Sequence, residues 1–129
     1  MQETDKVKFE YAIVRVVPKV ERGEFFNVGV ILFSKRKKFL DIKYHIDPNK
    51  LKCFSDEMDL ESLNDYLNAW KQICLGAPAG GAIGKLDLPD RFRWLTASRS
   101  TIIQSSQTHS GLCYDPKKEL EEIFKNSVL

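Results

Sequence analysis

The sequence predicts an α+β fold: an antiparallel meander of three to four strands packed against a central helix, about 59–75, and a C-terminal helix, about 116–126. Three strand-like segments joined by short connections occupy the first third of the chain, which favours antiparallel pairing. Helical spacing of apolar residues replaces strand alternation in the later segments. The length suits one hydrophobic core, so we expect a single domain over 1–129, with 1–7 as a flexible tail.

The first strand is predicted over Phe9–Val17, where β-branched and aromatic residues occupy both alternating faces. Pro18 ends it, because proline cannot donate to the strand ladder. Arg15 is the exception, since it shares a face with Tyr11 and other apolar residues. Its side chain must therefore reach solvent along its stem or meet an acid or a ligand.

The second strand, Phe25–Phe33, is apolar almost throughout and is expected to be the central strand. Asn27 and Gly29 interrupt it, and an internal glycine indicates a bulge or a close approach of another backbone or a ligand. The third strand, Phe39–Ile46, alternates between apolar and polar residues, which predicts one face against the core and one against water. His45 falls on the water side.

The central helix is predicted to begin after Asp59, a good N-cap, and to run to about Leu75. Its apolar positions repeat at helical spacing and indicate core packing: Leu60, Leu63, Leu67, Trp70 and Cys74. Gly76 suits the C-cap and opens the glycine-rich loop 76–84. This loop lacks the GK[ST] ending of a phosphate-binding P-loop, so it does not indicate nucleotide binding.

The last third of the chain has weaker signals. Residues 90–95, DRFRWL, predict a short helix or turn, and Thr101–Gln104 could add a fourth strand. Asp115 and Pro116 form a strong N-cap and first-turn pair for the final helix. Leu120, Ile123 and Phe124 are then expected to face the core.

Charge and hydropathy exclude some classes of function. The net charge of +2 is too small to favour nucleic-acid binding, and the basic run Lys35–Lys38 reads as a solvated hairpin tip. No apolar stretch approaches the roughly 20 residues of a membrane helix. The N-terminal segment is charged where a signal peptide would be apolar, so we expect a cytoplasmic protein with no membrane partner.

The cysteines do not indicate a disulfide framework or a metal site. Cys53, Cys74 and Cys113 are odd in number and lack CxxC spacing, as expected for reduced thiols. His109 and Cys113 stand four residues apart, but a closed zinc site needs about four ligands. We therefore expect neither a bound metal nor a cofactor.

Two segments of the chain are distinctive: YAIVRVVPKVERGEFFNVGVILF, from Tyr11 to Phe33, and RFRWLTASRSTIIQSSQTHSGL, from Arg91 to Leu112. With these segments the chain resembles the DUF3037 family of uncharacterised bacterial proteins. The resemblance implies a small stand-alone bacterial protein without an established activity. It also suggests a HipA-like kinase as a protein partner.

The same two segments supply one candidate surface for an anion or a partner. Arginine forks and hydroxyl groups suit phosphate or carboxylate recognition if both segments meet at one end of the sheet. The candidates are Arg15, Glu21, Arg22, Glu24 and Asn27 from the first segment, and Arg91, Arg93, Ser98, Arg99, Ser100, Thr101 and His109 from the second. The alternative is structural: these groups satisfy the backbone of a long irregular segment, with the glutamates paired to the arginines.

Two classes of function fit these residues. The first is a non-catalytic binding or regulatory module, favoured because the chain shows no motif for a nucleophile and base, paired carboxylates or a metal. The second is a small phosphoester- or nucleotide-processing enzyme. In that hypothesis His109 is the general acid or base, and Arg99, assisted by Arg91, stabilises developing negative charge.

Overall fold

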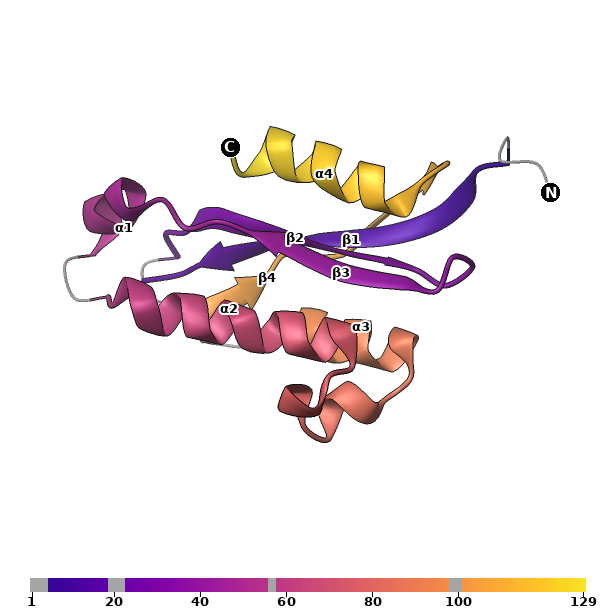
Figure 1. Ribbon diagram of the computed structural model, residues 1–129. Helices are drawn as coiled ribbons and strands as arrows, with labels where there is room; N and C mark the ends of the chain where they lie inside the picture. Colours follow the sequence, from indigo (N-terminus) through magenta and orange to yellow (C-terminus); the bar gives the residue numbers. More distant parts are fainter. Residues whose placement is uncertain (1–4, 19–22, 56–57, 98–100) are drawn as a thin grey trace.

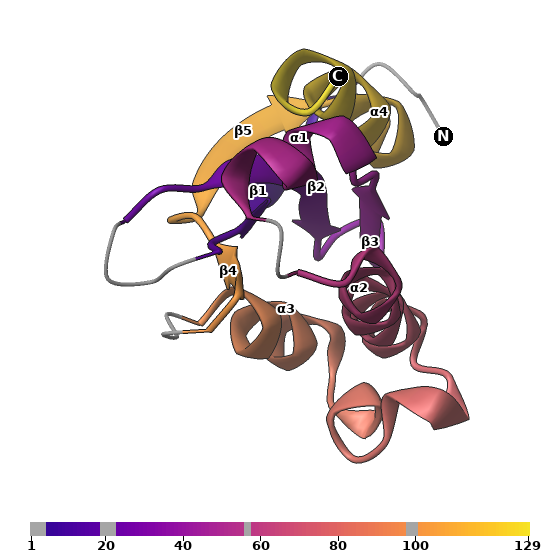
Figure 2. The same cartoon turned by 90° about the vertical axis from the view of Figure 1, so that its left-hand side faces the viewer.

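The computed structural model describes residues 5–18, 23–55, 58–97 and 101–129. Its elements confirm the α+β class, with an antiparallel sheet between two helical layers (Figure 1). Figure 2 shows α4 on one face of the sheet, and α2 with α3 on the other. The elements are β1 (Val7–Val16), β2 (Phe26–Ser34), β3 (Phe39–Tyr44), α1 (Pro48–Phe54), α2 (Leu60–Leu75), η2 (Pro78–Gly80), η3 (Ile83–Lys85), α3 (Leu88–Thr96), β4 (Ile103–Ser105), β5 (His109–Cys113) and α4 (Pro116–Ser127).

The predicted meander is present as β1, β2 and β3, with β2 between the other two. Two short strands share the other edge of β1: β4 pairs with residues 14–16 and β5 with residues 7–11. Ser106 bridges the gap between them, because its N–H donates to the Ile13 carbonyl at 2.8 Å and its Oγ accepts from the Ile13 N–H at 2.8 Å. The fifth strand was not predicted, since its exposed, polar sequence lacks strand alternation.

The first strand begins earlier than predicted. Val7 is buried and pairs with Cys113 of β5, so the ordered strand includes part of the tail expected over 1–7. The prediction missed this start because it depends on pairing with a strand far along the chain. Local sequence near Val7 does not contain that information.

A β-bulge interrupts the pairing of β1 with β2. Val14 is opposite Gly29, but Arg15 is opposite Asn27, so Val28 has no partner in the register. Gly29 also lies close to β3, where an added Cβ would come within 2.8 Å of the Lys43 carbonyl oxygen. Both the bulge and the close backbone approach expected around Gly29 are confirmed.

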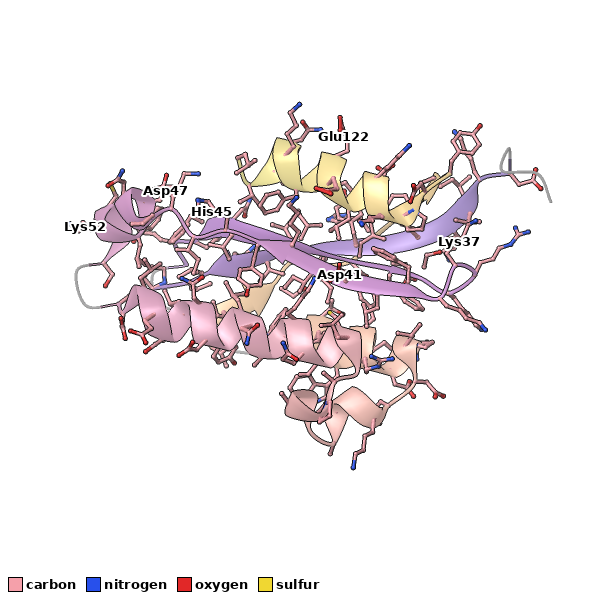
Figure 3. The ribbon with its side chains drawn as sticks, in the orientation of Figure 1. Lys37, Asp41, His45, Asp47, Lys52 and Glu122 are labelled. Carbon is pink, nitrogen blue, oxygen red and sulfur yellow. The ribbon has the colours of Figure 1, made fainter. Side chains whose placement is uncertain are left out.

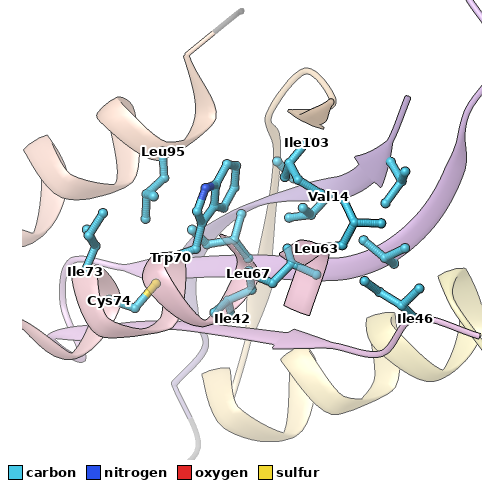
Figure 4. Packing of buried hydrophobic residues seen from close by; sticks show 14 of the residues in the cluster. Val14, Ile42, Ile46, Leu63, Leu67, Trp70, Ile73, Cys74, Leu95 and Ile103 are labelled. Carbon is cyan, nitrogen blue, oxygen red and sulfur yellow. The ribbon is translucent and has the colours of Figure 1, made fainter. Parts of the chain in front are cut away.

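The larger core lies between the sheet and the layer formed by α2 and α3 (Figure 4). Asp59 caps α2 by accepting from the Glu61 N–H at 3.2 Å, and Gly76 ends the helix at φ 67°. Leu67 is fully buried at the centre of this core, beside Trp70. The predicted helix bounds and its apolar stripe are confirmed.

The smaller core lies between the sheet and α4, and contains Leu120 and Phe124. Asp115 caps α4 as predicted, by accepting from the Lys117 N–H at 3.0 Å. Because α4 also reaches β3, the second face of that strand is not simply a water face. Lys43 pairs with Glu121 of α4, and this hydrogen bond lowers the pKa of the Glu121 carboxyl.

Helix α1 was not predicted, although Asp47 and Pro48 repeat the capping signal of the final helix. The predicted short helix or turn around DRFRWL is confirmed as α3. None of the helices in the described ranges has the length and apolar composition needed to cross a membrane.

The three thiols differ in accessibility, and this predicts their order of reaction. Cys53 is exposed, while Cys74 and Cys113 are buried. Burial raises the pKa of Cys74 to about 12, and burial also raises the pKa of Cys113, so both stay protonated near neutral pH. We expect a thiol reagent such as DTNB to label Cys53 first in the native protein. Tryptic mass mapping after partial labelling checks this, and equal labelling of Cys74 would contradict it.

Candidate functional site

The candidate site is centred on Arg15, near the end of β1. Arg15 is in register with Asn27 of β2 on one side and Gln104 of β4 on the other. Residues in register share a face of a sheet. The two segments singled out in the sequence therefore meet here, one on each side of Arg15. We call Arg15, Phe25, Asn27 and Gln104 the Arg15 site.

The bulge at Val28 sets the position of Asn27. Phe26 and Val28 both face the larger core, so Asn27 between them points to the α4 face. There its Nδ2 donates to the Ser127 carbonyl at the end of α4, at 3.1 Å. Its Oδ1 is buried and accepts no hydrogen bond within the described residues. Bulges commonly re-aim a side chain in this way beside functional sites.

The Arg15 guanidinium lies over an aromatic ring. Its central carbon is 4.0 Å from the centroid of Phe25, a cation–π contact that holds the planar group in place. The Nε atom is buried and has no hydrogen-bond partner in the described part of the chain. An unsatisfied buried donor costs about 1–3 kcal/mol, and an incoming acceptor would recover part of that cost.

Hydrogen bonds of Thr101 and Gln104 hold the β4 side of the Arg15 site. The Gln104 Nε2 donates to the Thr101 carbonyl at 2.7 Å, and the Thr101 hydroxyl donates to the Ile103 carbonyl. The Thr101 hydroxyl is thus used locally, as the structural alternative expects. These bonds fix the start of β4 beside Arg15.

A cavity of about 340 Å³ adjoins Asn27 on the side of β3. It is lined by His45, Asp47 and Lys50, together with the C-terminal residues Val128 and Leu129. Figure 3 shows His45 and Asp47 at the α1 end of the sheet. Sequence reasoning placed His45 on an exposed strand face and did not connect it with Asn27, because α1 was not predicted.

Arg91 lies in the opposite layer and has a structural role. Its guanidinium donates to the carbonyls of Ile73 at 2.9 Å, Cys74 at 3.0 Å and Leu86 at 2.9 Å, and so caps the end of α2. Arg93 makes an exposed pair with Asp90 at 3.1 Å. Neither arginine joins the Arg15 site.

His109 is exposed on β5 and packs against Tyr11, with 5.2 Å between the ring centroids. It shares the α4 face with Arg15, but the four residues from Tyr11 to Arg15 separate the two by roughly 13 Å along the strand. The same spacing within β5 prevents His109 and Cys113 from binding one ion. Within the described ranges, no three His, Cys, Asp or Glu side chains converge on a metal site.

The remaining candidates cannot be assigned to the site. Glu24 lies exposed just before β2. Glu21, Arg22, Ser98, Arg99 and Ser100 lie outside the described residues.

Sequence reasoning did not single out Phe25, Gln104 and Lys50. Phe25 carried a usable signal, since it directly precedes a buried strand and stands two residues from Asn27.

Comparisons with known proteins identify the family of the chain. Residues 11–128 match the model of the family described as "Protein of unknown function (DUF3037)". No curated protein and no solved structure matches the chain.

Proposed function

We propose that this chain, which belongs to the DUF3037 family of unknown function, is a non-catalytic recognition module. In this proposal it binds an acidic group of a protein partner at Arg15. The observation that carries this proposal is the Arg15 guanidinium, held on Phe25 with its buried Nε unsatisfied among the described residues. An arginine fixed in this way is pre-organised to bind a carboxylate or phosphate with little further loss of side-chain entropy.

Exposed apolar side chains at the same end of the sheet favour a protein over a free anion. Phe25 and Ile102 are 44% and 45% exposed, and Phe54 of α1 is 38% exposed. Phe54 stacks on Phe26 at 5.0 Å, and the Ile102 carbonyl accepts from the Val17 N–H at 2.7 Å, so all three lie near the end of β1. Phe25 contacts the Arg15 guanidinium itself, and a charged group beside exposed apolar side chains is typical of a protein interface.

The family resemblance suggests a HipA-like kinase as the partner to test first, and the proposed setting is the bacterial cytoplasm. The interaction would hold the kinase through an acidic side chain or a phosphorylated residue. Arginine binds both groups through the same two-pronged geometry. A reducing cytoplasm would also keep the three cysteines as free thiols.

Arg15→Gln is expected to weaken partner binding at least about tenfold, since a charged hydrogen bond contributes roughly 1.5–3 kcal/mol. Arg15→Lys should recover part of the affinity, because lysine keeps the positive charge but lacks the two-pronged hydrogen-bonding geometry of arginine. Isothermal titration calorimetry with a purified HipA-like kinase measures both variants. Capture from native cells identifies any other protein that the wild type retains and Arg15→Gln loses.

Arg36→Gln is the matched control, because it removes the same charge from the tip of the β2–β3 hairpin, at the other end of β1. The control should bind the partner like the wild type. Unchanged binding by Arg15→Gln, or equal losses in both variants, would contradict the proposal. Thermal melts of all variants show whether a loss reflects unfolding.

A further inference from the structure

A second concave site lies at the opposite end of β1 and on the opposite face of the sheet. It is a cavity of about 240 Å³ between the start of β1, the tip of the β2–β3 hairpin and the first turns of α3. Its lining residues are Lys8, Phe9, Glu10, Phe33, Lys35, Arg36, Pro89 and Arg93. We call it the basic pocket.

The charge of the basic pocket is strongly one-sided. Its lining contains four basic residues and a single acidic one, Glu10. Arg93 has a partner in Asp90, but both side chains are more than half exposed, and such surface pairs are weak enough to exchange for a ligand. No ion pair of Lys8, Lys35 or Arg36 is present within the described ranges. The pocket therefore concentrates positive charge that the described residues leave largely unneutralised.

The backbone holds the hairpin cations in a closed turn. The Lys38 N–H donates to the Lys35 carbonyl at 3.2 Å, and Lys38 has a φ of 52°. A residue other than glycine is uncommon in this left-handed backbone region and carries some strain there. The chain thus has lysine where glycine or asparagine would fit the turn better. A hairpin tip that is only solvated does not require lysine at position 38.

Apolar side chains form one wall of the basic pocket. Phe33 is in register with Glu10, is buried and stacks on Phe92 of α3 with 5.3 Å between the ring centroids. Pro89, at the start of α3, closes the other side. A rigid apolar wall under a basic rim can bind a ligand that has both an anionic end and an apolar body.

We propose that the basic pocket binds a small organic phosphate, with its phosphate groups between Lys8 and Arg36 and its apolar part against Phe33 and Pro89. The pocket is slightly smaller than the roughly 300–1,000 Å³ typical of ligand pockets, which suits a small ligand. A nucleic-acid strand would instead need an extended basic stripe, and the whole chain has a net charge of just +2. The proposal does not depend on the Arg15 site.

Magnesium-free titrations with ADP and with inorganic pyrophosphate test the proposal. Both should bind in low salt, with ADP tighter because its base and ribose add contact with the apolar wall. Amide chemical-shift changes from ADP should centre on residues 8–10, 33–36 and 89–93. Arg36→Gln should weaken ADP binding at least about tenfold, the effect of losing one charged hydrogen bond.

Lys37→Gln is the matched control, since Lys37 belongs to the same turn (Figure 3) and carries the same charge. Lys37 is not among the residues that line the pocket. It should change ADP affinity less than about twofold, because exposed charges are screened by solvent. Arg15→Gln should leave ADP binding unchanged, so failure of this proposal and failure of the partner proposal are distinguishable. Absence of ADP binding, equal losses in Arg36→Gln and Lys37→Gln, or tighter binding of a short single-stranded RNA would overturn the proposal.

Discussion

Replacing Leu67 with alanine is expected to lower the free energy of unfolding by about 2–5 kcal/mol, the range for burial lost from a well-packed core. Leu67 is fully buried, and it lies where α2 meets the sheet. The loss combines the transfer free energy of the removed methyl groups with the cavity they leave. Since small domains have a total stability of about 5–15 kcal/mol, this is the largest effect we expect from a single substitution.

Leu75→Ala is the matched control in the same helix, because Leu75 is 60% exposed. Its expected change is within about 0.5 kcal/mol, as for most surface substitutions. Urea denaturation followed by circular dichroism measures both variants. Comparable losses for the two leucines would contradict the burial of the predicted apolar stripe.

Replacing Arg91 with alanine is expected to cost about 2–3 kcal/mol of unfolding free energy, which is the upper part of the range for one charged hydrogen bond. The guanidinium donates three hydrogen bonds, to the carbonyls of Ile73, Cys74 and Leu86. Removing it takes this partner from the last carbonyls of α2, although the helix keeps its left-handed cap at Gly76. Hydrogen bonds to charged groups contribute roughly 1.5–3 kcal/mol each. The three bonds are not additive, because water reaches part of the vacated site.

Arg93→Ala, two residues along the same helix, provides the comparison. Its pair with Asp90 is exposed, so we expect a change below about 0.5 kcal/mol. Thermal and urea unfolding check the difference between the two arginines. If Arg91→Ala were as stable as wild type but bound the partner less well, Arg91 would have a recognition role and the capping interpretation would be wrong.

Local signals were sufficient for most of the predicted elements. The apolar stripe of α2 and its Asp59 cap are both encoded within one short segment, so the helix was predicted with nearly correct bounds. Helix α4 followed from Asp115 and Pro116 in the same way. Helix α1 carried the equivalent pair, Asp47 and Pro48, but its seven residues are too few for a recognisable apolar period.

Arg15 stands out from the amino-acid sequence alone. A charged residue on an otherwise apolar strand face must have a particular environment, because burying an unpaired charge is costly. Asn27 and Gly29 likewise stand out within a buried strand. Such exceptions to a local pattern are visible in one short segment, so they require no knowledge of the rest of the chain.

Only the tertiary structure shows which of these unusual residues lie at the same site. Arg91 and Thr101 are close in the chain, yet Arg91 caps α2 on one side of the sheet while Thr101 lies beside β4 near Arg15. The pairing of β1 with β4 and β5 joins residues about a hundred positions apart. The sequence thus determined the class of fold, the main helices and the unusual residues, because these follow from local periodicity and capping. Strand pairing, the Val28 bulge and the two separate cationic sites arise from long-range packing, which no local pattern encodes.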